Sequence, residues 1–314
     1  MLPNFFCIGA QKCGTTTIWH ILDAHPDIFM AQPRETKFFY DELQFAEGIQ
    51  KYEVQYFSSW AGQTAAGEKC PEYLYVPVVA QRIYETIGTD VKFIIVLRSP
   101  AQRAFSHYRH NMMMLRECRS FDEALESEYC CMQKGESIPV PYGYIMRGFY
   151  ANQLKTYLNF FDLNQFLILN FEKEIATNQK VLSDRLFDFL GVKRFYSEKL
   201  PYFSGHPRLE DLTINIKKDG NDPKKHFVEI SRERFDLRQL IKLMSRKKQR
   251  QNWKHRIYNP SPAMIQFAHN LLQNKSVGLK LSPKQELEIN RRYFFQEIEQ
   301  LNELIQFDLN DWLK

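Results

Sequence analysis

A short stretch near the N-terminus has the composition of a phosphate-binding loop. Residues 9–17 read Gly-Ala-Gln-Lys-Cys-Gly-Thr-Thr-Thr, between an apolar run and a segment with helical spacing. Two glycines five positions apart let backbone N–H groups curl around a phosphate, and the start of the next helix adds partial positive charge. Lys12 brings a full charge to the same loop. The stretch therefore predicts a site for a phosphorylated ligand.

This loop departs from the pattern of ATP- and GTP-binding loops, G-x-x-x-x-G-K-[ST]. The glycine spacing is the same, but Thr15 stands in the lysine position and the lysine is residue 12. Mg²⁺ chemistry also uses an aspartate at the end of a later strand. The apolar run 92–97 ends instead in Arg98, which would repel Mg²⁺ and attract a second anion. We therefore expect an anionic nucleotide without an essential metal; a kinase using ATP and Mg²⁺ is the alternative enzyme.

A nucleotide with anionic groups at both places is 3′-phosphoadenosine 5′-phosphosulfate (PAPS). The sequence resembles the PAPS-dependent sulfotransferases, particularly the branch of heparan-sulfate sulfotransferases and their bacterial relatives. The matching blocks keep the family's order and cover the chain well to about residue 191. They are the loop 9–17, Arg34-Glu35-Thr36-Lys37-Phe38-Phe39, Glu68-Lys69-Cys70-Pro71-Glu72-Tyr73, and 92–109. The resemblance implies a P-loop-like fold and sulfuryl transfer from PAPS to an acceptor, with release of the bisphosphate PAP.

The resemblance also implies roles for individual residues. Lys12 would stabilise the bridging oxygen of the phosphosulfate as the S–O bond breaks. Glu35 would act as the base toward an acceptor hydroxyl or amine, with His20 and His107 as rival bases. Lys69 would orient the sulfuryl group or the acceptor. The residues expected around the 5′-phosphosulfate are Gln11, Lys12, Cys13, Gly14, Thr15, Thr16 and Thr17.

The 3′-phosphate would be bound further along the chain. Arg98 and Ser106 occupy the family's positions for this group, and Ser106 lies two helical turns beyond Arg98. A later stretch, residues 204–208, resembles a Ser-Gly-x-Pro-Arg loop of bacterial members. It predicts Ser204, Gly205 and Arg208 as further cofactor contacts; a plain surface loop is the alternative.

The acceptor is less closely specified. The family position before the two phenylalanines often holds histidine, and here it is Lys37. We expect a small natural product (a polyketide, an alkaloid toxin or a peptide), with a carbohydrate as the alternative. A non-catalytic PAP-binding module is the alternative from another functional class.

The elements that must position these residues follow from the apolar pattern. Short apolar runs at 5–8, 28–30, 92–97 and 166–169 predict strands, and segments with helical spacing lie between them. Such alternation predicts an α/β fold with three layers, in which helices flank a central parallel sheet. The helices are expected at 15–24, 77–87, 100–114, 121–133, 150–161 and 178–190, and a long amphipathic helix at 282–313.

The whole chain, residues 1–314, is expected to form one sulfotransferase domain. Its core would cover 1–191, an irregular basic region 192–262, and C-terminal helices 263–314. Residues 232–256 contain ten basic and two acidic residues, with an amphipathic basic helix as a candidate at 238–248. This stretch predicts a flap over an anionic ligand; a solvated face, or a surface for RNA or a membrane, is the alternative.

The composition excludes several classes of protein. Of 314 residues, 44% are hydrophobic and 25% charged, which excludes a disordered chain or a disulfide-dense miniprotein. The net charge of +5 suits an anionic ligand but is too small to indicate a nucleic-acid partner. Six scattered cysteines predict no metal site and fit a reducing cytosol. No apolar run of about 18 residues and no secretion signal is present, so we expect no transmembrane segment and a cytoplasmic location.

Overall fold

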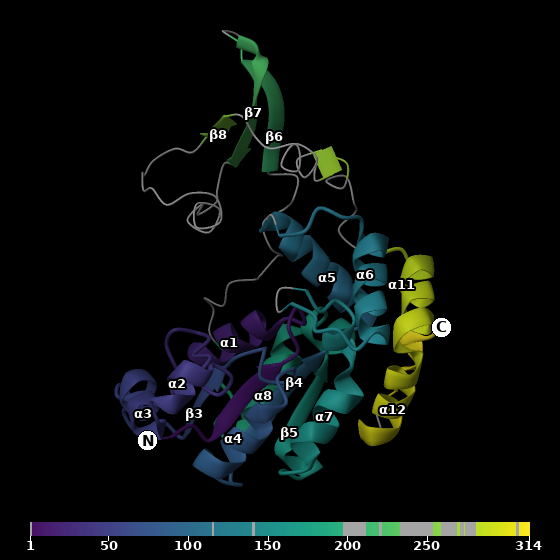
Figure 1. Cartoon of the computed structure of the whole chain (residues 1–314). Coiled ribbons are helices and arrows are strands. Elements are labelled where there is room, and N and C mark those ends of the chain that lie inside the picture. Colours follow the sequence, from purple (N-terminus) through teal and green to yellow (C-terminus); the bar gives the residue numbers. More distant parts are fainter. Residues whose placement is uncertain are drawn as a thin grey trace. The chain divides into compact units, whose positions relative to one another are not determined.

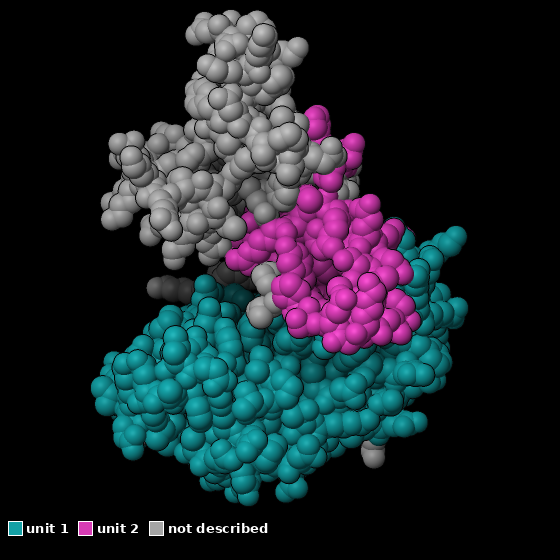
Figure 2. Space-filling model, viewed as in Figure 1, with its two compact units in different colours: residues 1–103, 146–203, 284–314 teal, residues 104–145, 204–283 magenta. Residues whose placement is uncertain are grey.

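The computed structural model describes most of the chain and divides into two compact units. The residues described are 2–114, 116–139, 142–196, 212–219, 222–232, 254–258, 269–270, 273, 281–305 and 308–314, with the backbone alone between 212 and 258. The first unit comprises residues 1–103, 146–203 and 284–314, and the second 104–145 and 204–283 (Figure 2). The assignment of the whole chain to one functional domain stays a prediction.

Five parallel strands form the centre of the first unit (Figure 1). They are β1 (Phe5–Gly9), β2 (Ile28–Met30), β3 (Ala65–Lys69), β4 (Lys92–Leu97) and β5 (Phe166–Asn170), in the order β2-β3-β1-β4-β5. Parallel strands covered on both faces are continuously apolar, and all five residues of β1 are buried. The predicted α/β fold with a central parallel sheet is confirmed. Of the five strands, β3 was not predicted.

Helices cover both faces of this sheet (Figure 1). The helices of the first unit before the C-terminal segment are α1 (Thr15–Asp23), α2 (Glu42–Ala46), α3 (Ile49–Phe57), α4 (Val78–Ile87), α7 (Tyr150–Leu158) and α8 (Gln179–Leu190). His25, just after α1, packs on Phe187 of α8 with ring centroids 4.6 Å apart. On the opposite face, Tyr84 of α4 packs on Phe160, just beyond α7, at 5.4 Å.

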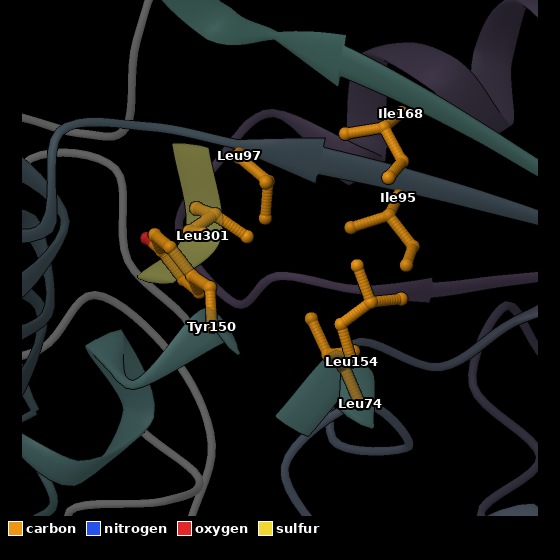
Figure 3. A pocket seen from close by; sticks show the side chains of 7 residues that line it. All are labelled: Leu74, Ile95, Leu97, Tyr150, Leu154, Ile168 and Leu301. Carbon is orange, nitrogen blue, oxygen red and sulfur yellow. The ribbon is translucent and has the colours of Figure 1, made fainter. Parts of the chain in front are cut away.

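An apolar layer joins the sheet to the helices directly below the ends of the strands. Figure 3 shows its side chains, which come from strands β4 and β5, from the segment after β3 and from helices α7 and α12 (Phe295–Ile305): Leu74, Ile95, Leu97, Tyr150, Leu154, Ile168 and Leu301. At the other end of β4, the ring of Phe93 stacks on Phe166, with centroids 4.8 Å apart. Burial of these side chains fixes the strand ends relative to the helices.

The C-terminal segment of the first unit is largely helical. It consists of α11 (Pro283–Ile289), a π-helical turn η5 (Asn290–Phe294), α12 (Phe295–Ile305) and a 3₁₀ turn η6 (Asn310–Trp312). The predicted end of the long helix at Leu313 is wrong, because residues 308 and 309 are not helical. Buried Asn290 accepts a hydrogen bond from the Ala101 N–H at 3.0 Å and donates to Ser99 Oγ at 3.1 Å. The segment thus holds the turn that follows β4.

The second unit contains helices and a separate sheet. Helix α5 (Pro100–Met113) begins in the first unit and continues into the second, which also holds α6 (Phe121–Gln133). Ser120 and Glu123 form a capping box at the start of α6. Strands β6 (Leu212–Asp219), β7 (Asp222–Arg232) and β8 (Lys254–Tyr258) form an antiparallel sheet. Sequence analysis expected irregular structure here; the candidate basic helix at 238–248 lies outside the described residues.

No helix in the described part of the chain combines the length and the apolar character needed to cross a membrane.

Gly67 provides a test of the packing of β3 between its neighbours. It pairs with Phe5 of β1 and Met30 of β2, and a Cβ at this position would lie 2.5 Å from the Phe5 carbonyl oxygen. We expect Gly67→Ala to lower the free energy of unfolding by about 1–3 kcal/mol, as overpacking typically does. Urea unfolding measures this change. Leu43→Ala is the control, because Leu43 is 82% exposed; equal stability of the two variants would contradict the packing described.

Candidate active site

The strand order indicates that a ligand would bind at the edge of the sheet where the carboxyl ends of the strands meet. In the strand order, the chain moves from β1 toward the β2 end of the sheet, whereas it moves from β4 toward the opposite end, where β5 lies. In open parallel sheets, ligands bind outside the carboxyl ends of the strands where the direction of connection reverses. Here that point lies between the ends of β1 and β4. The predicted phosphate loop follows β1, and Arg98 follows β4.

The phosphate loop turns sharply between β1 and α1. Lys12 and Gly14 both have positive φ values, 71° and 91°. A Cβ on Gly14 would lie 3.1 Å from Phe171 and Ile175, which belong to a π-helical turn, η3 (Phe171–Ile175), directly after β5. Only glycine fits both the backbone conformation and this close approach. Gly14 therefore lets the turn after β5 pack against the loop.

Gly14 is also the N-cap of α1 and has no side chain to satisfy the first N–H groups of the helix. The N–H groups of a helix's first turn have no partner within the helix, and the helix dipole adds positive potential there. Thr15 is buried, and Thr16 and Thr17 are half-buried with hydroxyls in the same turn. Together they provide the donors that an anion at this place requires.

Three cations influence each other at this edge. The pKa of Lys12 is lowered from its ordinary value to about 8. Burial is the largest cause, and the charges of Arg98 and Arg103 contribute to the same shift. Like charges gathered in a partly buried place repel each other unless an anion joins them. The cation cluster therefore fits a polyanionic ligand, as the sequence predicted.

Arg98 is held by two aromatic residues. Its Cζ lies over the Phe171 ring, 4.6 Å from the ring centroid, and the Tyr150 hydroxyl donates to the Arg98 carbonyl at 3.0 Å. Arg98 Nε is buried without a hydrogen-bond partner among the described residues, and Glu172 Oε1 lies 3.6 Å from it. Burial raises the pKa of Glu172, although Arg98 opposes that shift. An additional acceptor, such as a phosphate oxygen, would satisfy Nε.

Glu35 and Lys69 form an ion pair at the same edge. Lys69 is the last residue of β3, and its Nζ donates to Glu35 Oε1 at 2.5 Å. The Lys69 side chain is 3% exposed and that of Glu35 is 40% exposed. The pair thus has a fixed, buried ammonium and a carboxylate that solvent or an acceptor can reach. Sequence analysis named both residues but did not predict that they pair.

The surroundings of Glu35 contain further cations. Arg34 and Lys37 are both exposed, and the Arg34 guanidinium lies over the Trp19 ring at 5.3 Å. His20 packs edge-on against Trp19, and burial followed by the charges of Arg34 and Lys69 lowers its pKa. Arg34 and Lys37 thus add exposed cations to the segment that carries Glu35.

The side chains of Gln11 and Cys13 contact residues outside the loop, Glu72 and Tyr150. Gln11 donates to Glu72 at 3.0 Å, and Arg147, which is buried, lies 3.9 Å from the same carboxylate oxygen. The Cys13 thiol lies 3.7 Å from the Tyr150 hydroxyl, and burial raises the pKa of this thiol to about 11. Both side chains are thus held by residues that pack around the loop, and their contact with the cofactor stays a prediction.

Sequence analysis missed three residues that shape this edge: Glu72, Phe171 and Glu172. Glu72 lies in the quoted block 68–73 and could have been noticed there. Phe171 and Glu172 follow β5 without any motif in this sequence to single them out. Their role depends on the sheet order, which places β5 beside β4.

Ser106 and the later loop 204–208 are not part of the first unit's described residues. Ser106 is half-buried in α5 and belongs to the second unit, where His107, the second rival base, packs its ring against Tyr144 at 5.1 Å. Ser204, Gly205 and Arg208 lie outside the described residues. Within the described residues, no three His, Cys, Asp or Glu side chains are grouped as a metal site would need.

Comparison with known proteins identifies the family. The sulfotransferase domain family matches residues 2–280. The chain belongs to the sulfotransferase family. A solved sulfotransferase from Alicyclobacillus acidocaldarius superimposes with a TM-score of 0.64, at 25% identity and over 100% of both chains. The predicted P-loop-like sulfotransferase fold is thus confirmed.

The chain is also similar to heparan sulfate glucosamine 3-O-sulfotransferases of the 3B1 type. It is 31% identical to the Mus musculus protein and 29% to the Homo sapiens protein, over 212 residues that make up 67% of this chain and 52% of each relative. The predicted resemblance to that branch is confirmed. The chain spans about half the length of these relatives.

The lowered pKa of Lys12 makes a prediction about proton uptake. A bound phosphate would raise this pKa above its value of about 8, so the bound state holds more protons above that pH. Binding of PAP at about pH 8.5 should therefore take up a fraction of one proton, and the affinity should fall as pH rises further. Calorimetry in two buffers of different ionisation enthalpy measures the uptake.

Lys12→Met should abolish this uptake, whereas Lys51→Ala should retain it, because Lys51 is an exposed residue paired with Glu47 on α3. Undiminished uptake in Lys12→Met would show that Lys12 does not contact the ligand.

Proposed function

We propose that this protein transfers the sulfuryl group of PAPS to a hydroxyl or amine of an acceptor and releases PAP. The observation that carries the proposal is the presence, at one sheet edge, of both a cationic phosphate loop and the Glu35–Lys69 pair. The first supplies the binding of an anionic leaving group. The second supplies a carboxylate that can accept a proton.

The first half of the site would hold the donor and stabilise the leaving group. The N–H groups and hydroxyls at the start of α1 bind the 5′-phosphate, and Arg98 binds the 3′-phosphate. As the acceptor attacks sulfur, the bond from sulfur to the bridging oxygen breaks and its electron pair stays on that oxygen. The Lys12 ammonium stabilises this developing charge. Removing one such donor typically costs about 10²–10³ in rate.

The second half of the site would remove the acceptor's proton. Lys69 holds the Glu35 carboxylate in one orientation through the 2.5 Å contact. The acceptor O–H or N–H gives its proton to Glu35 while its lone pair forms the new bond to sulfur. Protonation weakens the pair, which leaves the Lys69 ammonium available to a sulfuryl oxygen.

Two acceptor classes are proposed: a small natural product, which the sequence analysis expects, and a carbohydrate. Exposed Arg34 and Lys37 beside Glu35 favour the carbohydrate if it carries acidic groups. The names of the heparan sulfate relatives point the same way. A panel of acceptors with labelled PAPS distinguishes the two, and activity on neutral phenols alone would leave the cations without a role.

The donor is tested first by calorimetry with PAP, ATP and ADP, with and without Mg²⁺. Metal-independent preference for PAP supports the proposal, whereas Mg²⁺-dependent turnover of ATP favours a kinase. PAP binding with no transfer to any acceptor favours a non-catalytic module.

Glu35→Gln tests the base directly. The variant keeps the size of the side chain but cannot accept a proton, so turnover should fall about 10²–10⁴-fold while PAP affinity stays close to that of the wild type. Steady-state kinetics and calorimetry measure the two quantities. Glu42→Gln is the control, because its carboxylate is 76% exposed on the nearby helix α2. Wild-type turnover in Glu35→Gln would remove Glu35 as the base and leave His20 and His107 as candidates.

Arg98→Ala tests the second anchor of the nucleotide. Loss of a charge-assisted hydrogen bond should weaken PAP binding about 10- to 100-fold, with a smaller effect on the affinity for adenosine 5′-phosphosulfate, which lacks the 3′-phosphate. Arg194→Ala is the matched control, since Arg194 forms an exposed ion pair with Asp188. Equal weakening for both nucleotides would contradict the assignment of Arg98 to the 3′-phosphate.

A further inference from the structure

A second carboxylate lies directly behind the Glu35–Lys69 pair and has no role so far. Glu68, the residue before Lys69 in β3, is completely buried. Its partners are three hydroxyl groups: Tyr52 donates to Oε1 at 2.9 Å, Tyr73 donates to the same oxygen at 3.1 Å, and Thr36 donates to Oε2. A buried carboxylate held by hydroxyls alone is costly to the fold, so its presence calls for an explanation.

The contacts of Glu68 run parallel to those of the reactive pair. Glu35 and Thr36 are consecutive, and so are Glu68 and Lys69. Lys69 bonds to Glu35 on the solvent side, while Glu68 bonds to Thr36 on the buried side. Two adjacent residues of the loop are thus attached to two adjacent residues of β3. Such a double attachment fixes both the position and the direction of the loop.

The same hydroxyls also hold the backbone that follows Glu35. The Phe38 N–H donates to Thr36 Oγ1 at 3.4 Å, and the Phe39 N–H donates to the Tyr73 hydroxyl at 3.3 Å. Tyr56 of α3 donates to the Thr36 carbonyl at 3.5 Å. The loop therefore depends on Glu68 through several connected hydrogen bonds.

We propose that Glu68 is a positioning residue: its ionised carboxylate accepts all three hydroxyl hydrogen bonds, and through Thr36 it holds Glu35 against Lys69. This inference rests on the proposed function of Glu35. It explains why a carboxylate rather than an amide stands here, because only a carboxylate accepts at both oxygens without bringing a donor.

The charge state of Glu68 gives the proposal a pH signature. Burial raises the pKa of Glu68 to about 7, and its three hydrogen bonds oppose this shift. Facing it are the hydroxyls of Tyr52 and Tyr56 from α3, Tyr73, and Tyr157 from α7, with the Cys70 thiol, and their pKa values are all raised. These neighbours are neutral near pH 7, so Glu68 is the group of this cluster that titrates there.

Activity and stability should respond to this titration in opposite directions. Glu68 has a higher pKa in the folded state, about 7, than its ordinary value of 4.5. The folded state therefore holds an extra proton between these values, and its stability falls as pH rises through that window. Turnover should instead rise through about pH 7, because ionised Glu68 completes the three hydrogen bonds.

Glu68→Gln tests the proposal, since the amide keeps the shape but places a donor where an acceptor is needed. We expect kcat to fall about 10- to 100-fold, the scale of a catalytic group misplaced by an ångström, with PAP affinity close to wild type. The rise in kcat near pH 7 should disappear. Hydrogen exchange should quicken in residues 36–39 and stay unchanged in the loop 9–17.

Thr36 provides the second variant and a matched control. Thr36→Val removes the hydroxyl at constant shape and should reproduce the Glu68→Gln effect without adding to it in the double variant. Thr36→Ser keeps the hydroxyl and should retain most of the activity. If Glu68→Gln fails to fold, the two Thr36 variants decide the matter.

Unchanged kcat and pH profile in both Glu68→Gln and Thr36→Val would overturn the inference. So would a loss of PAP affinity equal to the loss of kcat, which indicates general disruption. If the wild type transfers no sulfuryl group, the proposed function fails, and unchanged exchange at 36–39 would then overturn the positioning role separately.

Discussion

The gathering of positive charge at the carboxyl ends of β1 and β4 is the constraint on which the rest of the site depends. Lys12 and Arg98 follow the strands β1 and β4 and stay close together, because these two strands are neighbours in the sheet. The pKa of Lys12 is lowered by burial first and by repulsion from the charge of Arg98 after it. The fold accepts this repulsion by packing Arg98 on Phe171 and by placing Glu172 nearby. Such an arrangement favours the bound form of an anion over the empty site.

The same edge keeps two carboxylates in different environments. Glu35 is partly exposed and paired with a buried ammonium, whereas Glu68 is fully buried among hydroxyls. Both take part in the contacts between the loop after β2 and the end of β3. Glu35 lies on the solvent side of these contacts and Glu68 on the buried side. In the proposed reaction, the base must be the carboxylate that an acceptor can reach, which is Glu35. The buried one can act only through the backbone that it holds.

Sequence reasoning predicted those parts of the fold in which the local pattern and the tertiary structure agree. Strand β4 is apolar and buried from Phe93 to Leu97 and is followed by Arg98, so the strand and its carboxyl end were predicted. Strand β3 reads Ala-Ala-Gly-Glu-Lys and is buried throughout, although its composition favours neither a strand nor burial. Its polar residues are buried because Glu35, Thr36 and the tyrosines satisfy them, and those partners come from distant segments. The sequence contains both halves of each pair but not the register that joins them.

The phosphate loop shows how far this limit extends. Its glycines and lysine could be interpreted from spacing alone, since a left-handed backbone position and a helix start are local features. The reason why position 14 excludes any side chain is different, because the obstacle is Phe171 and Ile175 from the turn after β5. That turn also provides the ring beneath Arg98 and the carboxylate beside it. One segment without a recognisable motif thus sets the shape of the loop and the environment of Arg98. A change in η3 would therefore alter the loop and the surroundings of Arg98 at once.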